Sequence, residues 1–215
     1  MEKNELGIAV IGSGRIGTLR ASMAARHPSV RFLAVSDHDK TRADVLAQRT
    51  GANLVTDDNY AAISHSEVDA VVVATPEHEH VEAVVQAVEL GKPVFLEKPL
   101  ALTLEDGDLI ADAVKKSGVE LFVGYSRRHD RRWMMTKEHI AAGRVGEIIS
   151  IQSRVMNTRA QMLEILKRSP DASTVLDVLT YYVDMGCWYL EGIPPVEVVA
   201  RGHGKVFREL GHDTN

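Results

Sequence analysis

Three glycines and an acid near the start of the chain have the types and spacing of a diphosphate-binding turn. Gly12, Gly14 and Gly17 follow directly on the apolar run Leu6–Ile11, and Asp37 lies twenty residues beyond the last glycine. Backbone N–H groups of such a turn approach a pyrophosphate closely, and the start of the following helix favours its negative charge. An acid in this position binds ribose hydroxyls and repels a 2′-phosphate. The pattern predicts a dinucleotide site that favours NAD over NADP, with a turn built from Gly12, Gly14, Arg15, Ile16 and Gly17.

Further polar residues follow two later apolar runs. Ala70–Ala74 leads into Thr75-Pro76-Glu77-His78, and Val94–Leu96 leads into Glu97-Lys98-Pro99. In an open parallel sheet, ligands bind outside the carboxyl ends of the strands. We therefore expect these residues to meet the glycine turn and Asp37 at one edge of a sheet.

The first 123 residues alternate between strand and helix patterns, which predicts a doubly wound parallel sheet of the α/β class. We expect a Rossmann domain over residues 1–124. Its predicted strands are Leu6–Ile11, Arg31–Val35, Asn53–Val55, Ala70–Ala74, Val94–Leu96 and Glu120–Val123. Its predicted helices are Arg15–Arg26, Thr41–Thr50, His78–Leu90 and Leu104–Lys116.

After Gly124 the alternation changes, which predicts a second domain of α+β type over residues 125–215. Its expected helices are Arg128–Ala142 and Thr174–Leu190, and its expected strands are Glu147–Val155 and Val196–Arg201. One or two strands cannot cover a helix layer. We therefore expect only part of an open sheet in this domain.

Composition excludes several classes of protein. The 215 residues carry a net charge of −5, which disfavours nucleic-acid and anionic-membrane partners. No apolar run approaches the roughly 18 residues that span a bilayer, and no signal-peptide pattern opens the chain. The single cysteine, Cys187, forms no internal disulfide, which favours a reducing cytoplasm. We expect this thiol to be buried in an apolar helix.

Together these motifs resemble the Gfo/Idh/MocA family, which includes glucose–fructose oxidoreductase, inositol 2-dehydrogenase and many sugar dehydrogenases. The resemblance covers essentially the whole chain and includes Ala74-Thr75-Pro76 with His80, Glu97-Lys98-Pro99 and Gly124-Tyr125-Ser126-Arg127-Arg128. It implies a Rossmann domain followed by a domain with a large open sheet, which often mediates oligomerisation, so a homo-oligomer is expected. Family chains are usually longer, so this one is expected to be short at its C-terminal end.

The resemblance also implies roles for the residues at the sheet edge. Lys98 would touch the substrate hydroxyl and help to move its proton, and the Lys98–Pro99 bond is expected to be cis. Thr75, Pro76, His80 and Glu97 would border the nicotinamide. The alternatives are a surface lysine before a turn proline and surface histidines at a helix start.

Asp177, Tyr181 and Asp184 have the spacing of residues on one face of a helix. Many family members carry Asp, then His, then Asp at these positions, and tyrosine replaces the histidine in the glucose–fructose oxidoreductase branch. The resemblance implies that Asp177 binds substrate, and we expect Asp184 to be structural. Tyr181 would act with Lys98, whose cation lowers the pKa of a nearby phenol. The alternative for Tyr181 is a packing aromatic.

Two further features concern the substrate pocket. Tyr125 and Arg127 would line it, since a guanidinium suits polyol or carboxylate oxygens; the alternative is a solvated basic cluster with Arg128, Arg131 and Arg132. The family usually has glycines before the helix that carries Asp177, whereas this chain has Asp171-Ala172-Ser173-Thr174. No metal site is expected, because His78 and His80 do not share a helix face and no acid or cysteine cluster completes a set.

The combined prediction is an NAD-dependent dehydrogenase that transfers a hydride between nicotinamide and a hydroxyl-bearing carbon of a sugar or cyclitol. Lys98, Tyr181 and Asp177 would be its catalytic residues, and a small polyol its partner. Two alternatives remain open at this point. One is a non-catalytic NAD-binding sensor or partner subunit, and the other is a defective, marginally folded gene product.

Overall fold

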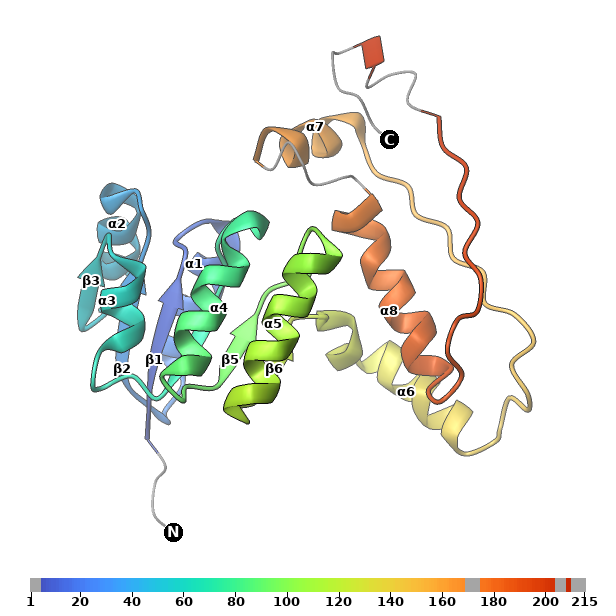
Figure 1. Cartoon of the computed structure of the whole chain (residues 1–215), viewed down its shortest axis with the longest axis horizontal. Coiled ribbons are helices and arrows are strands. Elements are labelled where there is room, and N and C mark those ends of the chain that lie inside the picture. Colours follow the sequence, from blue (N-terminus) through green and yellow to red (C-terminus); the bar gives the residue numbers. More distant parts are fainter. Residues whose placement is uncertain (1–4, 169–174, 204–207, 210–215) are drawn as a thin grey trace. The chain divides into compact units, whose positions relative to one another are not determined.

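The computed structural model describes residues 5–168, 175–203 and 208–209, and the chain divides into two compact units, Met1–Gly124 and Tyr125–Asn215. The first unit contains one parallel sheet with strand order β3-β2-β1-β4-β5-β6 (Figure 1). Its strands are β1 (Leu6–Ile11), β2 (Val30–Ser36), β3 (Leu54–Thr56), β4 (Ala70–Val73), β5 (Val94–Leu96) and β6 (Leu121–Val123). All six were predicted within a residue or two, and the parallel, doubly wound arrangement is confirmed.

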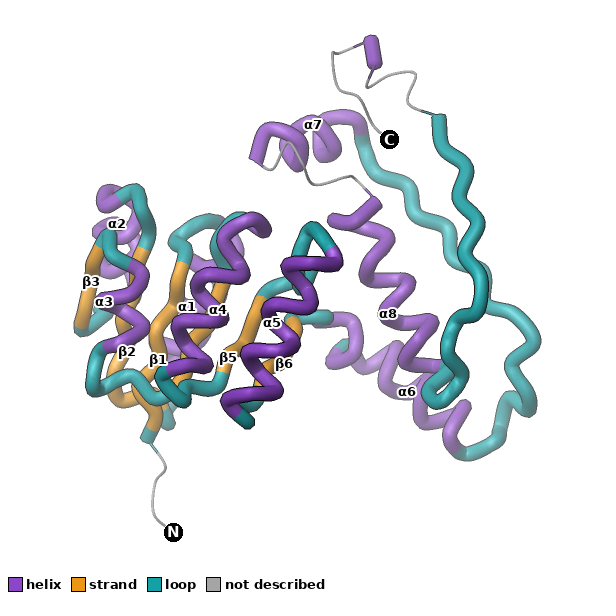
Figure 2. The backbone as a smooth tube through the Cα atoms, in the orientation of Figure 1, coloured by secondary structure: helices purple, strands orange, loops and turns teal. Residues whose placement is uncertain are grey.

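Helices cover both faces of this sheet (Figure 2). They are α1 (Arg15–Arg26), α2 (Lys40–Thr50), α3 (Asn59–Ser64), η1 (Glu77–Glu79), α4 (His80–Glu89) and α5 (Leu104–Ser117). The predicted helix His78–Leu90 begins instead with the short 3₁₀ turn η1. Helix α3 was not predicted, because six residues are too few to show a periodic apolar pattern.

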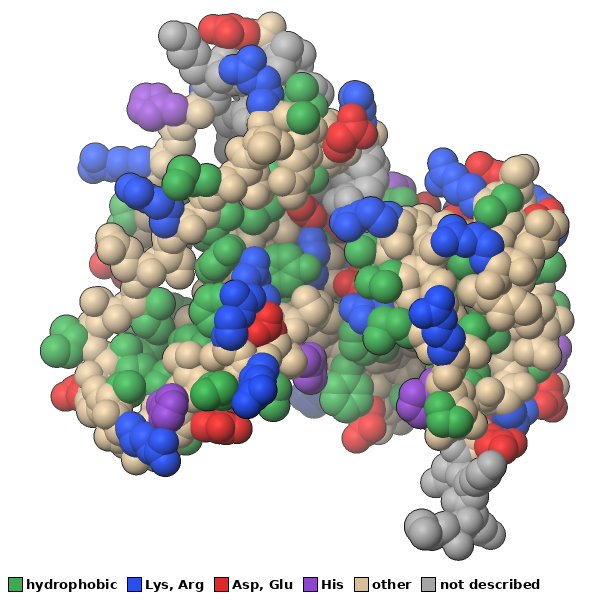
Figure 3. All heavy atoms as spheres, turned by 180° about the vertical axis from the view of Figure 1, so that it is seen from behind, with side chains coloured by type: hydrophobic (Ala, Val, Ile, Leu, Met, Phe, Trp, Pro, Cys, Tyr) green, Lys and Arg blue, Asp and Glu red, His purple; other side chains and the backbone are tan. Residues whose placement is uncertain are grey.

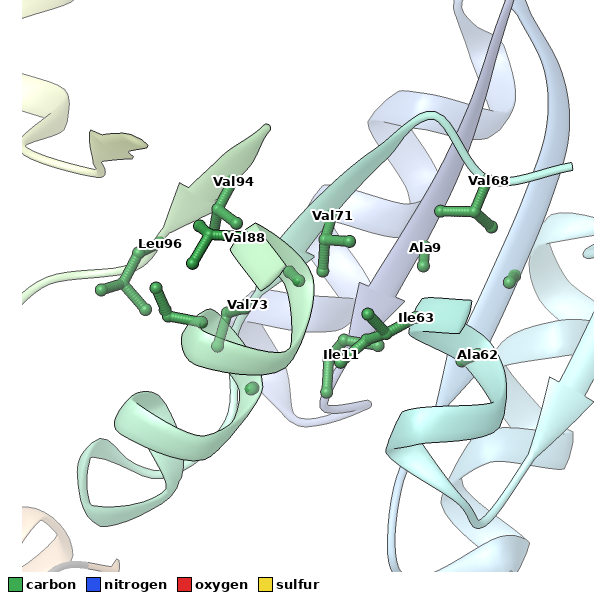
Figure 4. Packing of buried hydrophobic residues seen from close by; sticks show 14 of the residues in the cluster. Ala9, Ile11, Ala62, Ile63, Val68, Val71, Val73, Val88, Val94 and Leu96 are labelled. Carbon is green, nitrogen blue, oxygen red and sulfur yellow. The ribbon is translucent and has the colours of Figure 1, made fainter. Parts of the chain in front are cut away.

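Strand side chains alternate between two apolar cores, as a sheet covered on both faces requires. Ile11 and Val73 point into one core together with Ile63 of α3 and Val88 of α4 (Figure 4). Val10, the neighbour of Ile11, lies in the second core with residues of α1, α2 and β2: Ala21, Leu33, Val35 and Leu46. A one-residue shift of a strand would exchange these faces, so the two cores fix the register and hence the positions of the strand ends.

Among its described residues, the second unit contains helices joined by loops and no strand. The helices are η2 (Ser126–His129), α6 (Arg131–Ala141), α7 (Arg159–Arg168), the π-helical η3 (Val175–Leu179) and α8 (Thr180–Tyr189). The predicted helix over 128–142 is therefore divided at Asp130, whose side chain caps α6 by accepting from the amide of Arg132. Thr174, the predicted start of the last long helix, lies outside the described residues.

The predicted strands Glu147–Val155 and Val196–Arg201 are wrong as elements of this structure. Neither segment forms a strand, and Ile149 and Val196 are 95% and 98% exposed. A strand requires a partner for its backbone N–H and C=O groups, and the described part of this unit supplies no sheet to join. Apolar side chains are consequently open to solvent on this unit, and Figure 3 shows many of them among the charged groups.

Two other predictions are corrected in the second unit. Helix α7 was missed although Met162, Ile165 and Leu166 are buried at helical spacing. Cys187 is exposed on α8, not buried. Among the described residues, none of the helices has the length and apolar character needed to cross a membrane.

Candidate active site

The three glycines of the turn after β1 are required for different reasons. A Cβ on Gly12, whose φ is +94°, would lie 2.6 Å from the carbonyl oxygen of Ala74. A Cβ on Gly17 would lie 1.7 Å from the carbonyl oxygen of Gly12. A Cβ on Gly14 would meet nothing within 4 Å, and its φ of −69° suits any residue. Protein packing therefore explains Gly12 and Gly17 but leaves the space beside Gly14 open.

The open space lies at the N-terminus of α1, where the N-cap residue Gly14 has no side chain that could cap the first amides. The first amides of a helix have no acceptor within the helix, and the helix dipole adds positive potential there. Arg15 and Ile16, the other predicted members of the turn, provide the first of these amides. The residues present thus fit a diphosphate, since they combine amide donors, positive potential and room for close approach.

Asp37 follows β2 directly, and its carboxylate is already oriented by two backbone donors. Ser13 N donates to Oδ2 at 2.7 Å, and Asp39 N donates to Oδ1 at 2.9 Å. Each carboxylate oxygen accepts up to two hydrogen bonds, so both keep capacity for hydroxyl donors. The Ser13 contact ties the acid to the glycine turn.

A cavity of about 320 Å³ is lined by His38, the residue after Asp37, and by residues of α3 and α4. Four carboxylates line it, and His38 Nε2 is 3.6 Å from Glu79 Oε2. Its lining residues are His38, Asp57, Asp58, Asn59, Tyr60, Glu79, Glu82, Ala83 and Gln86. Sequence reasoning missed this cavity, because one of its walls is the unpredicted helix α3. Its acidic lining disfavours a phosphate group.

Glu97, which follows β5, is buried and paired with Arg20 of α1. Arg20 Nε donates to Glu97 Oε1 at 2.6 Å, and the Arg20 guanidinium carbon lies 4.8 Å from the centre of the Phe95 ring. Lys98 is half-buried and precedes a cis peptide bond to Pro99, as predicted. Arg20 was not a predicted site residue. Nothing local in the sequence relates it to a glutamate 77 positions away.

His80 is completely buried at the start of α4, so the surface alternative for this residue is wrong. Its Nδ1 lies 3.0 Å from the carbonyl oxygen of Pro99; because a carbonyl only accepts, Nδ1 carries the proton. Burial lowers the pKa of His80, against smaller raising effects of Glu77 and nearby backbone carbonyls. The imidazole is therefore neutral near pH 7. The other histidine, His78, is exposed.

Thr75 and Pro76 follow β4 and reach the same sheet edge as the residues above, because all six strands run parallel. The Thr75 hydroxyl is buried and has no hydrogen-bond partner among the described residues. The same holds for Nε2 of His80. Two buried polar atoms close to the predicted nicotinamide position are thus without hydrogen-bond partners among the described residues.

In the second unit, Arg127 is enclosed by aromatic rings and is not part of a solvated basic cluster. Its guanidinium carbon lies 4.6 Å from the ring centre of Tyr182, 5.2 Å from that of Tyr181 and 5.9 Å from that of Trp133. Arg127 Nε and Trp133 Nε1 are buried donors without acceptors among the described residues. Tyr125 packs edge-on against Tyr181 and bonds Thr180 Oγ1 through its hydroxyl at 2.9 Å.

Two other arginines of the basic segment, Arg128 and Arg132, each pair with an acid. Arg128 makes a two-pronged ion pair with Asp184, at 2.9 and 2.6 Å, and this hydrogen bonding raises the pKa of Arg128. Arg132 pairs with Asp130 at 3.0 Å. Asp184 therefore has a structural contact within the unit, in agreement with its predicted role.

Asp177 and Tyr181 do not lie on one regular α-helix. Asp177 belongs to the π-helical η3, and Tyr181 lies in the first turn of α8. A π-helical turn is wider than an α-helical turn, so the predicted common face is displaced between the two residues. Both side chains are half-buried. The described residues contain no group of three or more His, Cys, Asp or Glu arranged to hold a metal ion.

Known proteins that are similar to this chain include dehydrogenases. Curated relatives include the scyllo-inositol 2-dehydrogenase (NAD(+)) of Bacillus subtilis, which is 31% identical over 95% of this chain. The myo-inositol 2-dehydrogenase of Thermotoga maritima is 33% identical over 95% of this chain. The chain spans 58% and 60% of the lengths of these two relatives.

A solved structure of scyllo-inositol dehydrogenase from Lactobacillus casei, with bound NAD(H) and scyllo-inositol, superposes with a TM-score of 0.78. It is 24% identical and matches 86% of this chain and 56% of that chain, so the likeness concerns the fold. Residues 6–125 match the model of the oxidoreductase family with an NAD-binding Rossmann fold, and residues 133–215 match the GFO/IDH/MocA C-terminal domain. The chain therefore belongs to the Gfo/Idh/MocA oxidoreductase family, as its motifs predicted.

Proposed function

We propose that this chain belongs to an NAD-dependent dehydrogenase that oxidises a secondary hydroxyl of a cyclitol or a related sugar. The observation that carries the proposal is the space beside Gly14, which packing within the protein leaves open at a helix N-terminus. The relatives named above as inositol 2-dehydrogenases supply the substrate class. We propose residues 1–124 as the cofactor domain and residues 125–215 as part of a domain for substrate binding and oligomerisation.

The cofactor end of the proposal rests on charge and hydrogen-bonding capacity. Amides of Arg15 and Ile16 would bind the diphosphate, and Asp37 would accept hydrogen bonds from the adenosine ribose. The acidic cavity at His38 would take the adenosine end and disfavour a 2′-phosphate, because Asp57, Glu79 and other carboxylates line it. Thr75, Pro76, His80 and Glu97 would border the nicotinamide. These features support NAD over NADP.

NAD supplies the hydride acceptor when bound, and the protein supplies orientation and proton transfer. Lys98 would take the hydroxyl proton as the substrate carbon is oxidised. Asp177 would accept hydrogen bonds from neighbouring hydroxyls and so orient the polyol. Arg127 and Trp133 support a polyol further, because their buried donors match hydroxyl oxygens. Tyr125 would line the same subsite, and Tyr181 would assist Lys98 in moving the proton.

The test is turnover with a panel of cyclitols and sugars. The full chain is incubated with NAD and each polyol, and the absorbance of NADH is followed. We expect turnover on at least one inositol, and its loss in Lys98→Met but not in Lys116→Met, an exposed lysine of α5. NAD binding by calorimetry without turnover on any polyol would instead favour a non-catalytic NAD-binding protein.

A further inference from the structure

Lys98 is held between two neighbours that are each anchored to a different helix. On one side, the Glu97 carboxylate bonds Arg20 of α1 through Nε at 2.6 Å and Nη2 at 2.5 Å. On the other side, the Pro99 carbonyl accepts from His80 of α4 at 3.0 Å. The Lys98 side chain is therefore displayed from a loop fixed immediately before and immediately after it.

The first anchor is an ion pair that is largely shielded from solvent. The side chains of Arg20 and Glu97 are 23% and 11% exposed, and the guanidinium also stacks on Phe95. A Cβ at Gly124 would lie 3.0 Å from Glu97 Oε2, so the glycine after β6 leaves room for the carboxylate. Charge-assisted hydrogen bonds of this kind fix geometry as well as energy. Glu97 therefore has one well-defined position.

The second anchor depends on a neutral imidazole with its proton on Nδ1. His80 is fully buried, and its Nδ1–H is the donor to the Pro99 carbonyl. Its position in the first turn of α4 is fixed by the packing of that helix on the sheet. The imidazole therefore connects the packed helix α4 to the carbonyl group of Pro99, the residue that follows Lys98.

We infer that Arg20 and His80 are positioning residues that hold the loop Glu97–Pro99 and thereby aim Lys98 at the reacting hydroxyl. This inference rests on the proposed function of Lys98. Arg20 lies on α1, whose first turn would bind the diphosphate. The same helix would therefore bind the diphosphate and hold Glu97 at the nicotinamide end of the cofactor site.

The first experiment compares Arg20→Met with Arg26→Met, an exposed arginine of the same helix. We expect kcat to fall about 10- to 100-fold in Arg20→Met, because misplacement of a catalytic group by about 1 Å costs this much. The KM for NAD should change less than the kcat, and Arg20→Lys should recover part of the rate. Arg26→Met should match the unmodified protein. Unchanged kcat in a folded Arg20→Met protein would overturn the inference.

The second experiment needs neither activity nor cofactor. Competitive acetylation of Lys98 by acetic anhydride at one fixed pH is followed by peptide mass spectrometry, with Lys116 as the internal reference. Lys98 is half-buried, so loosening of the loop that carries it should raise the labelling of Lys98 relative to Lys116 severalfold in Arg20→Met. Arg26→Met should leave this ratio unchanged. An equal ratio in Arg20→Met and the unmodified protein would contradict the role of the ion pair.

His80 is tested with two substitutions that differ in one donor. Asparagine places its side-chain N–H close to the position of Nδ1, whereas leucine removes the donor. We expect the kcat to fall in both variants and to be at least about 10-fold lower in His80→Leu than in His80→Asn, with thermal melting used to confirm that both fold. Equal rates in the two variants would overturn the role of the Pro99 contact. If the unmodified chain turns over no polyol, the proposed function fails, while the acetylation experiment still decides the inference about Arg20.

Discussion

Gly14→Ala should separate cofactor binding from stability. The new methyl group meets no protein atom within 4 Å, and the backbone angles at this N-cap suit alanine. Alanine is a poorer N-cap than glycine by roughly 0.5–1 kcal/mol, and the lower entropy of the unfolded chain offsets about 0.4–1 kcal/mol. The net change in the free energy of unfolding is therefore within about 0.5 kcal/mol, or less than about 2 °C in Tm.

Binding should respond quite differently, because the methyl group would occupy the space proposed for the diphosphate. Loss of one hydrogen bond to a charged group costs about 1.5–3 kcal/mol, which corresponds to a Kd for NAD raised about 10- to 150-fold. Calorimetric titration with NAD and thermal melting of the same sample measure the two quantities. An unchanged Kd in Gly14→Ala would refute the assignment of this space to the diphosphate.

Two other glycines serve as controls. Gly17→Ala should lower the free energy of unfolding by about 3 kcal/mol, because its Cβ would overlap the Gly12 carbonyl oxygen at 1.7 Å. Gly107→Ala in α5 should raise stability by about 1 kcal/mol without affecting NAD, since the nearest atom, Leu100 Cδ2, is at an ordinary 3.9 Å. A large loss of stability in Gly14→Ala, like that expected for Gly17→Ala, would show that the turn itself needs this glycine.

Three further outcomes are expected. Asp37→Ala should raise the Kd for NAD about 10- to 100-fold in calorimetry, because charged hydrogen bonds to the ribose are lost; an equal loss with NADP would contradict selection by this acid. The free energy of unfolding by urea should fall as the pH drops from about 7 to 5. Burial depresses the pKa of His80, so the unfolded state binds more protons than the folded state below the ordinary pKa near 6.5. His80→Asn should flatten this pH dependence. Asp184→Asn should destabilise the second unit by about 1–2 kcal/mol, because it weakens the ion pair with Arg128. Both tryptophans, Trp133 and Trp188, belong to this unit, so tryptophan fluorescence reports its unfolding alone. An unchanged denaturation midpoint would show that the ion pair does not contribute to stability.

The first unit follows its sequence closely because each strand carries its own apolar pattern and its own boundary. Val10 and Ile11 face opposite cores, and the polar residues that follow each strand then fall at one sheet edge. The positions of Gly12, Asp37 and Lys98 in the fold could therefore be predicted. The Arg20–Glu97 pair could not, because it joins residues from distant segments that only the folded sheet brings together.

The second unit shows the limit of pattern reasoning. The segment around Ile149 has the alternation of a strand, but alternation gives only a preference, and pairing requires a neighbour. Arg127 was predicted either to bind substrate or to be solvated, and its aromatic surroundings depend on how η2 packs against α8. Helix α7, by contrast, has a readable pattern of buried residues and was recoverable from the sequence.

The winding of the sheet reverses between β1 and β4, so two consecutive stretches of chain build the two halves of the unit. The loop at residues 65–69 is thus a natural crossover point for chimeras between relatives: the upstream parent would contribute the glycine turn and Asp37, and the downstream parent Lys98. Arg20 and Glu97 come from opposite sides of this junction. A hybrid that inherits only Arg20 or only Glu97 would contain a largely buried charge without its ion-pair partner. Functional chimeras in this fold must therefore keep the two residues together as a pair.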